Sequence, residues 1–93
     1  GSSGSSGQIH LFSEPQFQGH SQSFEETTSQ IDDSFSTKSC RVSGGSWVVY
    51  DGENFTGNQY VLEEGHYPCL SAMGCPPGAT FKSLRFISGP SSG

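Results

Sequence analysis

The sequence predicts an all-β domain in which two Greek-key motifs pack as a β-sandwich. Short segments alternate apolar and polar side chains, as half-buried strands do. No segment sustains the 3.6-residue hydrophobic period of an amphipathic helix. The second half of the chain also repeats the pattern of the first. Two similar halves made of short strands are what a pair of Greek keys requires.

The ends of the 93-residue chain are rich in Gly and Ser. Residues 1–7 and 88–93 look like expression linkers, so we exclude them from the fold prediction. About 80 residues remain, which suits one domain. We therefore predict a single domain over residues 8–87, with a first motif at 8–44 and a second at 45–87, excised from a longer protein.

In the first half, alternation predicts strands at residues 8–12, 21–25 and 39–42. The polar stretch between the last two of these is expected to be a loop, or a short strand and a loop. In the second half, Trp47 begins the first of the expected strands, which cover residues 47–51, 58–62 and 81–87.

Two segments of the second half are expected to lie outside regular strands. Residues 63–68 read as a turn with Tyr67 as its aromatic anchor. Glycines and prolines within residues 69–80 exclude a long regular element there, so at most a short helical turn fits at residues 70–73.

The repeat is clearest in a pattern of two aromatic residues and a glycine. We interpret it as a hairpin folded back over its own sheet, with the two rings packed together and the glycine supplying a positive φ or a close backbone approach. A hydroxyl from Ser39 or Ser83 could then satisfy backbone groups of the loop. The repeated positions are Phe12, Phe17 and Gly19, which recur 38 residues later as Tyr50, Phe55 and Gly57.

These motifs resemble a βγ-crystallin domain. Phe12-x4-Phe17-x-Gly19 with Ser39-Cys40-Arg41-Val42 is similar to its first Greek-key motif. Tyr50-x4-Phe55-x-Gly57, Gly65-His66-Tyr67-Pro68 and Ser83-Leu84-Arg85-Phe86 are similar to its second. The resemblance covers residues 8–87 and implies the fold predicted above. The Ser/Thr-rich, cysteine-poor composition is typical of a vertebrate non-lens member rather than of a lens protein.

The resemblance also implies calcium as the first ligand to consider. The family binds it through a loop of the form Asn/Asp-Asn/Asp-x-x-Ser/Thr-Ser, with further oxygens from the folded hairpins. Hard cations of this kind require six to eight oxygen ligands. The candidate ligands in this chain are Asp32, Asp33 and Ser36 in the first motif, and Glu53 in the second hairpin.

The spacing of these loops argues against tight calcium binding. The family places the final serine directly before the last strand of the motif, which is Ser39 here, and counting back puts Lys38 at a ligand position. In the second motif, residues 78–83 contain no acid and again carry a lysine, Lys82. We therefore expect at most one weak calcium site and no other cofactor. A solvated acidic surface is the simpler interpretation.

Charge and cysteine content limit the remaining functions. A net charge of -5, with four scattered Lys and Arg, argues against nucleic acid, and no apolar stretch is long enough to span a membrane. The odd number of cysteines favours reduced thiols in an intracellular, cytoplasmic chain. A Cys69–Cys75 disulfide remains the alternative.

No residue pattern predicts catalysis. His10, His20 and His66 accompany three cysteines without a known signature, and Cys69-x5-Cys75 lacks the paired spacing of a zinc site. We predict a non-catalytic structural or protein-interaction module that contacts neighbouring crystallin-like domains or another protein. A weak calcium-binding module and a carbohydrate-binding module are the alternatives.

Overall fold

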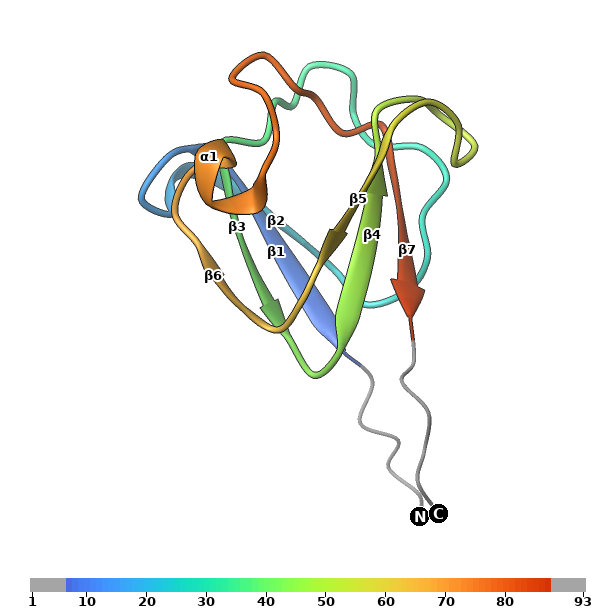
Figure 1. Cartoon of the computed structure of the whole chain (residues 1–93), viewed down its shortest axis with the longest axis horizontal. Coiled ribbons are helices and arrows are strands. Elements are labelled where there is room, and N and C mark those ends of the chain that lie inside the picture. The colour runs from blue at the N-terminus through green and yellow to red at the C-terminus, as the bar shows by residue number, and fades with distance from the viewer. Residues whose placement is uncertain (1–6, 88–93) are drawn as a thin grey trace.

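The computed structural model describes residues 7–87. The expected linkers therefore lie outside the described residues, apart from Gly7. The described part of the chain contains short strands and one helical turn (Figure 1). In chain order they are β1 (Gln8–Glu14), β2 (Gln18–Phe24), β3 (Ser39–Ser43), β4 (Ser46–Tyr50), β5 (Gln59–Leu62), β6 (Gly65–Tyr67), α1 (Leu70–Met73) and β7 (Ser83–Ile87).

The strands form two antiparallel sheets that pack face to face, as Figure 1 shows. One sheet has the order β2-β1-β3-β6 and the other the order β5-β4-β7. Their inner faces enclose one apolar core, and this burial is the main driving force for folding. The all-β sandwich prediction is confirmed. The largest fully buried apolar side chains are Trp47, Phe81, Ile9, Leu11, Leu62, Leu84 and Val49.

Each half of the chain lends a segment to the sheet of the other half. Strand β6 comes from the second half, yet it pairs with β3 of the first through Cys40↔Tyr67. In return, Thr28 of the first half forms an isolated bridge with Leu84 of β7, with N···O distances of 3.0 and 2.9 Å. The two halves are therefore interlocked, and neither half completes its sheet alone.

The exchange corrects one prediction. The sequence indicated a turn at residues 63–68, but residues 65–67 form strand β6. Gly65 and Pro68 are turn-forming residues, so local propensity hides the strand, which exists because β3 offers it an unpaired edge. The short helix is found where it was expected, and it ends at Gly74 with a left-handed φ of 80°.

Other strand boundaries differ from the predictions by a few residues. β1 continues to Glu14, and β2 runs from Gln18 to Phe24 rather than over residues 21–25. The closing strand begins at Ser83 rather than Phe81, because Phe81 enters the core from a loop and is 1% exposed. The edges of strands depend on partner strands, which sequence alternation does not show.

The strand register follows the sequence repeat. Ile9 pairs with Phe24 in the first half, and Trp47 pairs with Leu62 at the equivalent positions of the second half. Trp47 is fully buried and packs edge-on against Phe86, with ring centroids 5.1 Å apart. Within the described residues, its indole Nε1 is a buried nitrogen without a hydrogen-bond partner.

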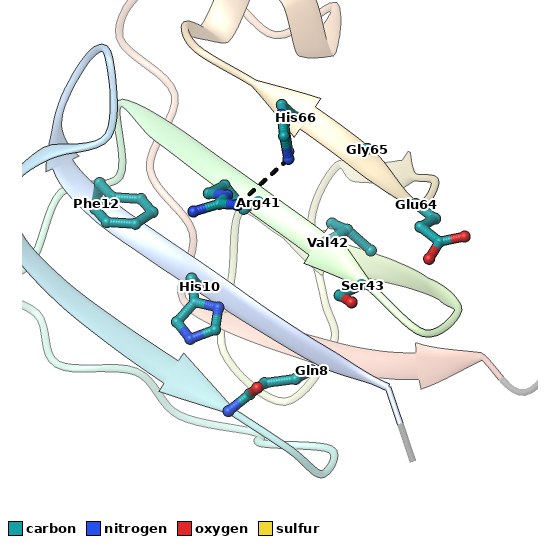
Figure 2. A pocket seen from close by; sticks show the side chains of 9 residues that line it. All are labelled: Gln8, His10, Phe12, Arg41, Val42, Ser43, Glu64, Gly65 and His66. Atoms are coloured by element: carbon teal, nitrogen blue, oxygen red, sulfur yellow. Dashed lines mark hydrogen bonds between the residues drawn. The ribbon is translucent and has the colours of Figure 1, made fainter. Parts of the chain in front are cut away.

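The outer faces of the two sheets differ in chemistry. On the four-stranded sheet, His10, Arg41 and His66 come from three neighbouring strands and lie in one row (Figure 2). On the three-stranded sheet, the equivalent row contains Val48 and Val61, and Val61 is 58% exposed. One outer face is therefore polar and titratable, while the other carries an exposed apolar side chain.

Candidate metal site

Both predicted hairpins fold back over their own sheets. The rings of Phe12 and Phe17 meet edge to face with centroids 5.6 Å apart and an interplanar angle of 76°. The rings of Tyr50 and Phe55 meet in the same way at 5.5 Å and 73°. Such edge-to-face pairs contribute about 0.5–1.5 kcal/mol beyond the area they bury. The ring-pairing prediction is confirmed in both halves.

The fold-back requires left-handed backbone at residues that are not glycine. Phe17 and Phe55 both have φ of 57°, in the region that favours glycine. Gly19 and Gly57 follow two residues later, with φ of 75° and 86°. Backbone strain at the aromatic positions persists only when the surrounding structure holds it, at a cost of about 1–3 kcal/mol each.

A buried serine holds each hairpin in place. Ser39 Oγ accepts a hydrogen bond from the Phe17 N–H at 3.1 Å and donates one to the Glu14 carbonyl at 2.7 Å. Ser39 is fully buried, as is Ser83 in the second half, so these bonds satisfy groups that have no access to water. The predicted role of the hydroxyl is therefore confirmed.

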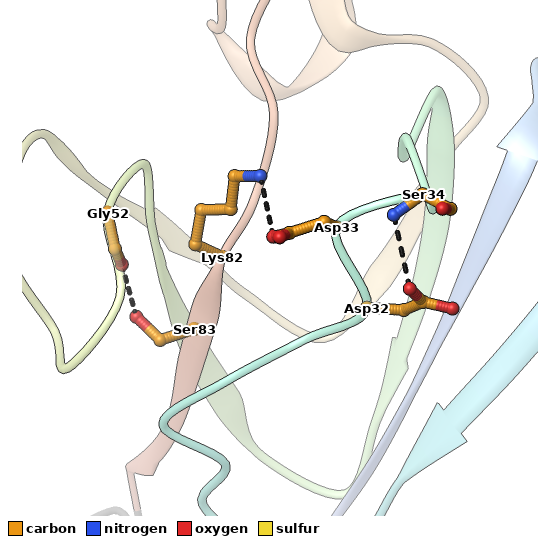
Figure 3. A network of polar contacts seen from close by, with 6 residues as sticks. All are labelled: Asp32, Asp33, Ser34, Gly52, Lys82 and Ser83. Atoms are coloured by element: carbon orange, nitrogen blue, oxygen red, sulfur yellow. Dashed lines mark hydrogen bonds and ion pairs between the residues drawn. The ribbon is translucent and has the colours of Figure 1, made fainter.

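The second hairpin repeats this arrangement. Ser83 Oγ accepts from the Phe55 N–H at 3.1 Å and donates to the Gly52 carbonyl at 2.8 Å, the latter shown in Figure 3. The serine therefore plays the same part in each half.

The acidic loop of the first motif lies between buried anchors. Ile31 and Phe35 are buried, whereas Asp32, Asp33 and Ser36 between and beside them are exposed. Asp32 Oδ1 accepts a hydrogen bond from the Ser34 N–H at 3.1 Å, which closes a local Asx turn (Figure 3). One carboxylate of this loop is thus engaged in shaping its own backbone.

Asp33 is engaged by a lysine from the other half of the chain. Lys82 Nζ lies 3.1 Å from Asp33 Oδ1, and Figure 3 shows Lys82 reaching across to this loop. The aspartate side chain is 75% exposed, so the pair contributes only about 0–1 kcal/mol to stability. The pair matters more for local charge. Lys82 stands directly before Ser83, where the family's calcium loop would place a ligand, so an ammonium group lies beside the second hairpin instead.

The structure places the candidate ligands Asp32 and Glu53 at different hollows. Glu53 lines an open hollow together with Asp51 and Lys82, at the second hairpin. Asp33 reaches this region only through its ion pair with Lys82. Asp32 borders a different hollow. Within residues 7–87, no group of three or more His, Cys, Asp or Glu side chains is arranged to hold a metal ion.

The Lys82–Asp33 contact could not be found from the sequence alone. The two residues are 49 positions apart, and each was assigned to a different motif. The available signal was the lysine that both motifs carry before the final serine, Lys38 and Lys82. That signal indicates the loss of a ligand position, but it does not name the carboxylate that pairs with the ammonium.

All three cysteines are free thiols. Cys40 is fully buried, and its Sγ lies 3.9 Å from Met73 Sδ. Burial, and to a smaller extent the nearby Cys75, raises the pKa of the Cys40 thiol to about 12. Burial also raises the pKa of Cys75. Because the thiolate is the reactive form, both behave as core side chains at neutral pH.

In the part of the chain that the structure describes, no helix has the length and apolar character needed to cross a bilayer.

The architecture defines a sandwich of two interlocked Greek keys with paired folded hairpins. The family model described as Beta/Gamma crystallin matches residues 8–87, and the chain belongs to this family. It is 46% identical over 80 residues to human "Beta/gamma crystallin domain-containing protein 2", covering 86% of this chain and 5% of that protein. It is 36% identical over 87 residues to carp (Cyprinus carpio) "Gamma-crystallin S", covering 88% of this chain and 50% of that protein.

A solved structure supports the same assignment. The "beta gamma crystallin from Ciona Intestinalis" superposes with a TM-score of 0.79 and 29% identity, covering 86% of this chain and 99% of the other. The chain therefore spans a complete domain of that structure but half or less of the two relatives named above. Domains of this family are generally non-catalytic structural modules.

Proposed function

We propose that this domain is a non-catalytic structural and protein-interaction module of a larger multi-domain protein, with degenerate calcium sites. The observation that carries the proposal is the ion pair between Lys82 and Asp33. Lys82 already neutralises the carboxylate of Asp33. Its ammonium group also repels a calcium ion at the hollow lined by Asp51 and Glu53.

The proposed partners are neighbouring crystallin-like domains or another protein. The match to the human relative covers 5% of that protein, which supports a long parent chain. The parent is proposed to be an intracellular, non-lens vertebrate protein that resembles the multi-domain protein called absent in melanoma 1. Free thiols at all three cysteines support an intracellular setting.

The test is a calcium titration followed by calorimetry and by backbone NMR. The parent domain is expected to show no tight site, with at most weak shifts confined to residues 31–39 and 51–55. Lys82→Ser removes the ammonium group, so carboxylates at the second hairpin should bind calcium at least several-fold better than in the parent. Lys38→Ser makes the same change at the equivalent position of the first motif, so any gain in that variant should map to residues 31–39 rather than to the second hairpin.

The second candidate function is a weak calcium-binding module that retains one site. The exposed carboxylate of Glu53 favours it, because Glu53 lines one hollow together with Asp51. Two tight sites in the parent domain would contradict the proposed degeneracy. A single weak site whose affinity is unchanged in Lys82→Ser would instead favour this second function.

A further inference from the structure

The outer face of the four-stranded sheet carries a row of three nitrogen-bearing side chains. His10 on β1 pairs in register with Arg41 on β3, which pairs in register with His66 on β6. Neighbouring strands lie about 4.8 Å apart, and paired residues point to the same face. The two histidines therefore lie on either side of Arg41 across the sheet, and Figure 2 shows all three side chains around one hollow.

The folded hairpin holds the guanidinium group in place. Arg41 Cζ lies 5.7 Å from the centroid of the Phe17 ring, a cation–π contact. The His66 ring meets the same Phe17 ring edge to face at 5.8 Å. Arg41 is exposed but rests on a rigid aromatic platform, so its planar donors are already oriented before a ligand arrives.

Arg41 also contacts the imidazole of His66. Arg41 Nη2 lies 3.4 Å from His66 Nε2. A guanidinium group only donates, so in this hydrogen bond the imidazole nitrogen is the acceptor. An anion that takes over the Arg41 donors would replace this contact.

Among residues 7–87, no carboxylate forms an ion pair with this row. Within residues 7–87, Lys82 and Asp33 form the ion pair, and Arg41 has no carboxylate within ion-pair distance. Glu64 lines the same hollow, but its Oε2 accepts a hydrogen bond from the Gly44 N–H at 3.2 Å. Figure 2 shows Glu64 at the end of the hollow away from His10. The row is therefore a local cationic spot on a chain of net charge -5.

We propose that His10, Arg41 and His66 form a binding site for a phosphate-sized dianion, of the chemical class of a phosphate monoester. This site goes beyond the proposed structural role and does not depend on it. Arginine binds such oxygens through two parallel N–H groups, and each imidazole can add a ring N–H donor. The charged and titratable groups that line the hollow around His66 are Arg41, His10 and Glu64.

The second half of the chain provides a matched comparison. Arg85 on β7 occupies the position equivalent to Arg41, and it is also exposed. Its partner in register is Val48 rather than a histidine, and Val48 pairs in turn with Val61. Arg85 therefore offers the same guanidinium group without flanking imidazoles.

The experiment is an NMR titration with inorganic phosphate at constant ionic strength and at pH 7.5. The parent domain is expected to give saturable shifts at the three residues of the row. Arg41→Gln should weaken phosphate binding about tenfold or more, because it removes charge-assisted hydrogen bonds. Arg85→Gln should leave the affinity unchanged. Both variants alter exposed side chains, and their melting temperatures check that they fold.

A second arm distinguishes the source of the anion. A phosphoserine peptide and its unphosphorylated form are titrated in the same way. Tighter binding of the phosphopeptide than of inorganic phosphate would identify a phosphorylated protein segment as the ligand, and equal binding would identify a free anion. Shifts that do not saturate, shifts that chloride reproduces, or equal weakening in Arg41→Gln and Arg85→Gln would each overturn the proposal.

Discussion

The two halves of this domain have nearly the same hairpin geometry but different residues around it. The aromatic centroids are 5.6 Å apart in the first half and 5.5 Å apart in the second. The serine hydroxyls accept at 3.1 Å in both halves, and donate at 2.7 and 2.8 Å. The residue pairs that differ include Cys40 and Leu84, Glu14 and Gly52, and His10 and Val48.

The comparison distinguishes residues that shape the hairpin from residues that contact the core or the solvent around it. Ring pair, serine and glycine recur because the fold-back needs each of them for backbone reasons. Core-facing and solvent-facing positions vary because they contact different neighbours in each half. Substitutions at equivalent positions can therefore test whether the two halves contribute equally to stability.

The largest difference is expected at the core positions. Leu84→Ala should reduce the free energy of unfolding by about 2–5 kcal/mol, because Leu84 is fully buried and its loss leaves a cavity. Cys40→Ala at the equivalent position removes only a sulfur atom and should reduce it by about 1 kcal/mol. Chemical denaturation of both variants measures the difference, and equal losses would show that the halves pack differently from this description.

The serine positions should show equal effects. Ser39→Ala and Ser83→Ala each leave a backbone N–H and a carbonyl without their partner inside the fold. Each substitution should therefore reduce the free energy of unfolding by about 1–3 kcal/mol. Thermal and urea unfolding of the two variants provide the measurement. A loss in only one of them would contradict the equivalence of the two hairpins.

Alkaline pH should destabilise the domain through the first half. The pKa of Cys40 is about 12 in the folded protein, well above that of an exposed thiol. The raised pKa means that folded Cys40 keeps its proton, so stability is full below the unfolded pKa and is lost as the pH rises above it. The expected loss is about 1.4 kcal/mol per pH unit above about pH 9.

The matched variant for this effect is Cys40→Ala. Urea unfolding between pH 8 and pH 11 should give a shallower pH dependence for Cys40→Ala than for the parent. The equivalent residue of the second half is Leu84, which does not titrate. Identical slopes for parent and variant would show that Cys40 ionises as easily in the folded protein as in the unfolded chain.

The smallest effect is expected where the hairpin loops differ. A Cβ at Gly52 would lie 2.8 Å from the Thr56 carbonyl oxygen and 2.6 Å from its hydroxyl, so Gly52→Ala should destabilise by about 1 kcal/mol. Glu14 occupies the equivalent position of the first hairpin and is exposed, so Glu14→Ala should change stability by less than about 0.5 kcal/mol. Melting temperatures of both variants test this order.

Much of the fold follows from local sequence signals. The repeat of Phe12 and Phe17 as Tyr50 and Phe55 predicted two folded hairpins, because two rings and a glycine at this spacing have few other arrangements. Alternation of apolar and polar side chains predicted the strand at residues 39–42, because alternation is a local property of the chain. These features depend on residues within one hairpin or one strand.

The tertiary structure decided the features that join distant segments. Strand β6 forms because β3 presents an open edge, and Lys82 meets Asp33 because the halves exchange segments. The row of His10, Arg41 and His66 likewise combines strands β1, β3 and β6, which are neighbours in the sheet although other strands separate them in the chain. Alternation within a strand shows which face a residue occupies, but only the pairing of strands brings these side chains together.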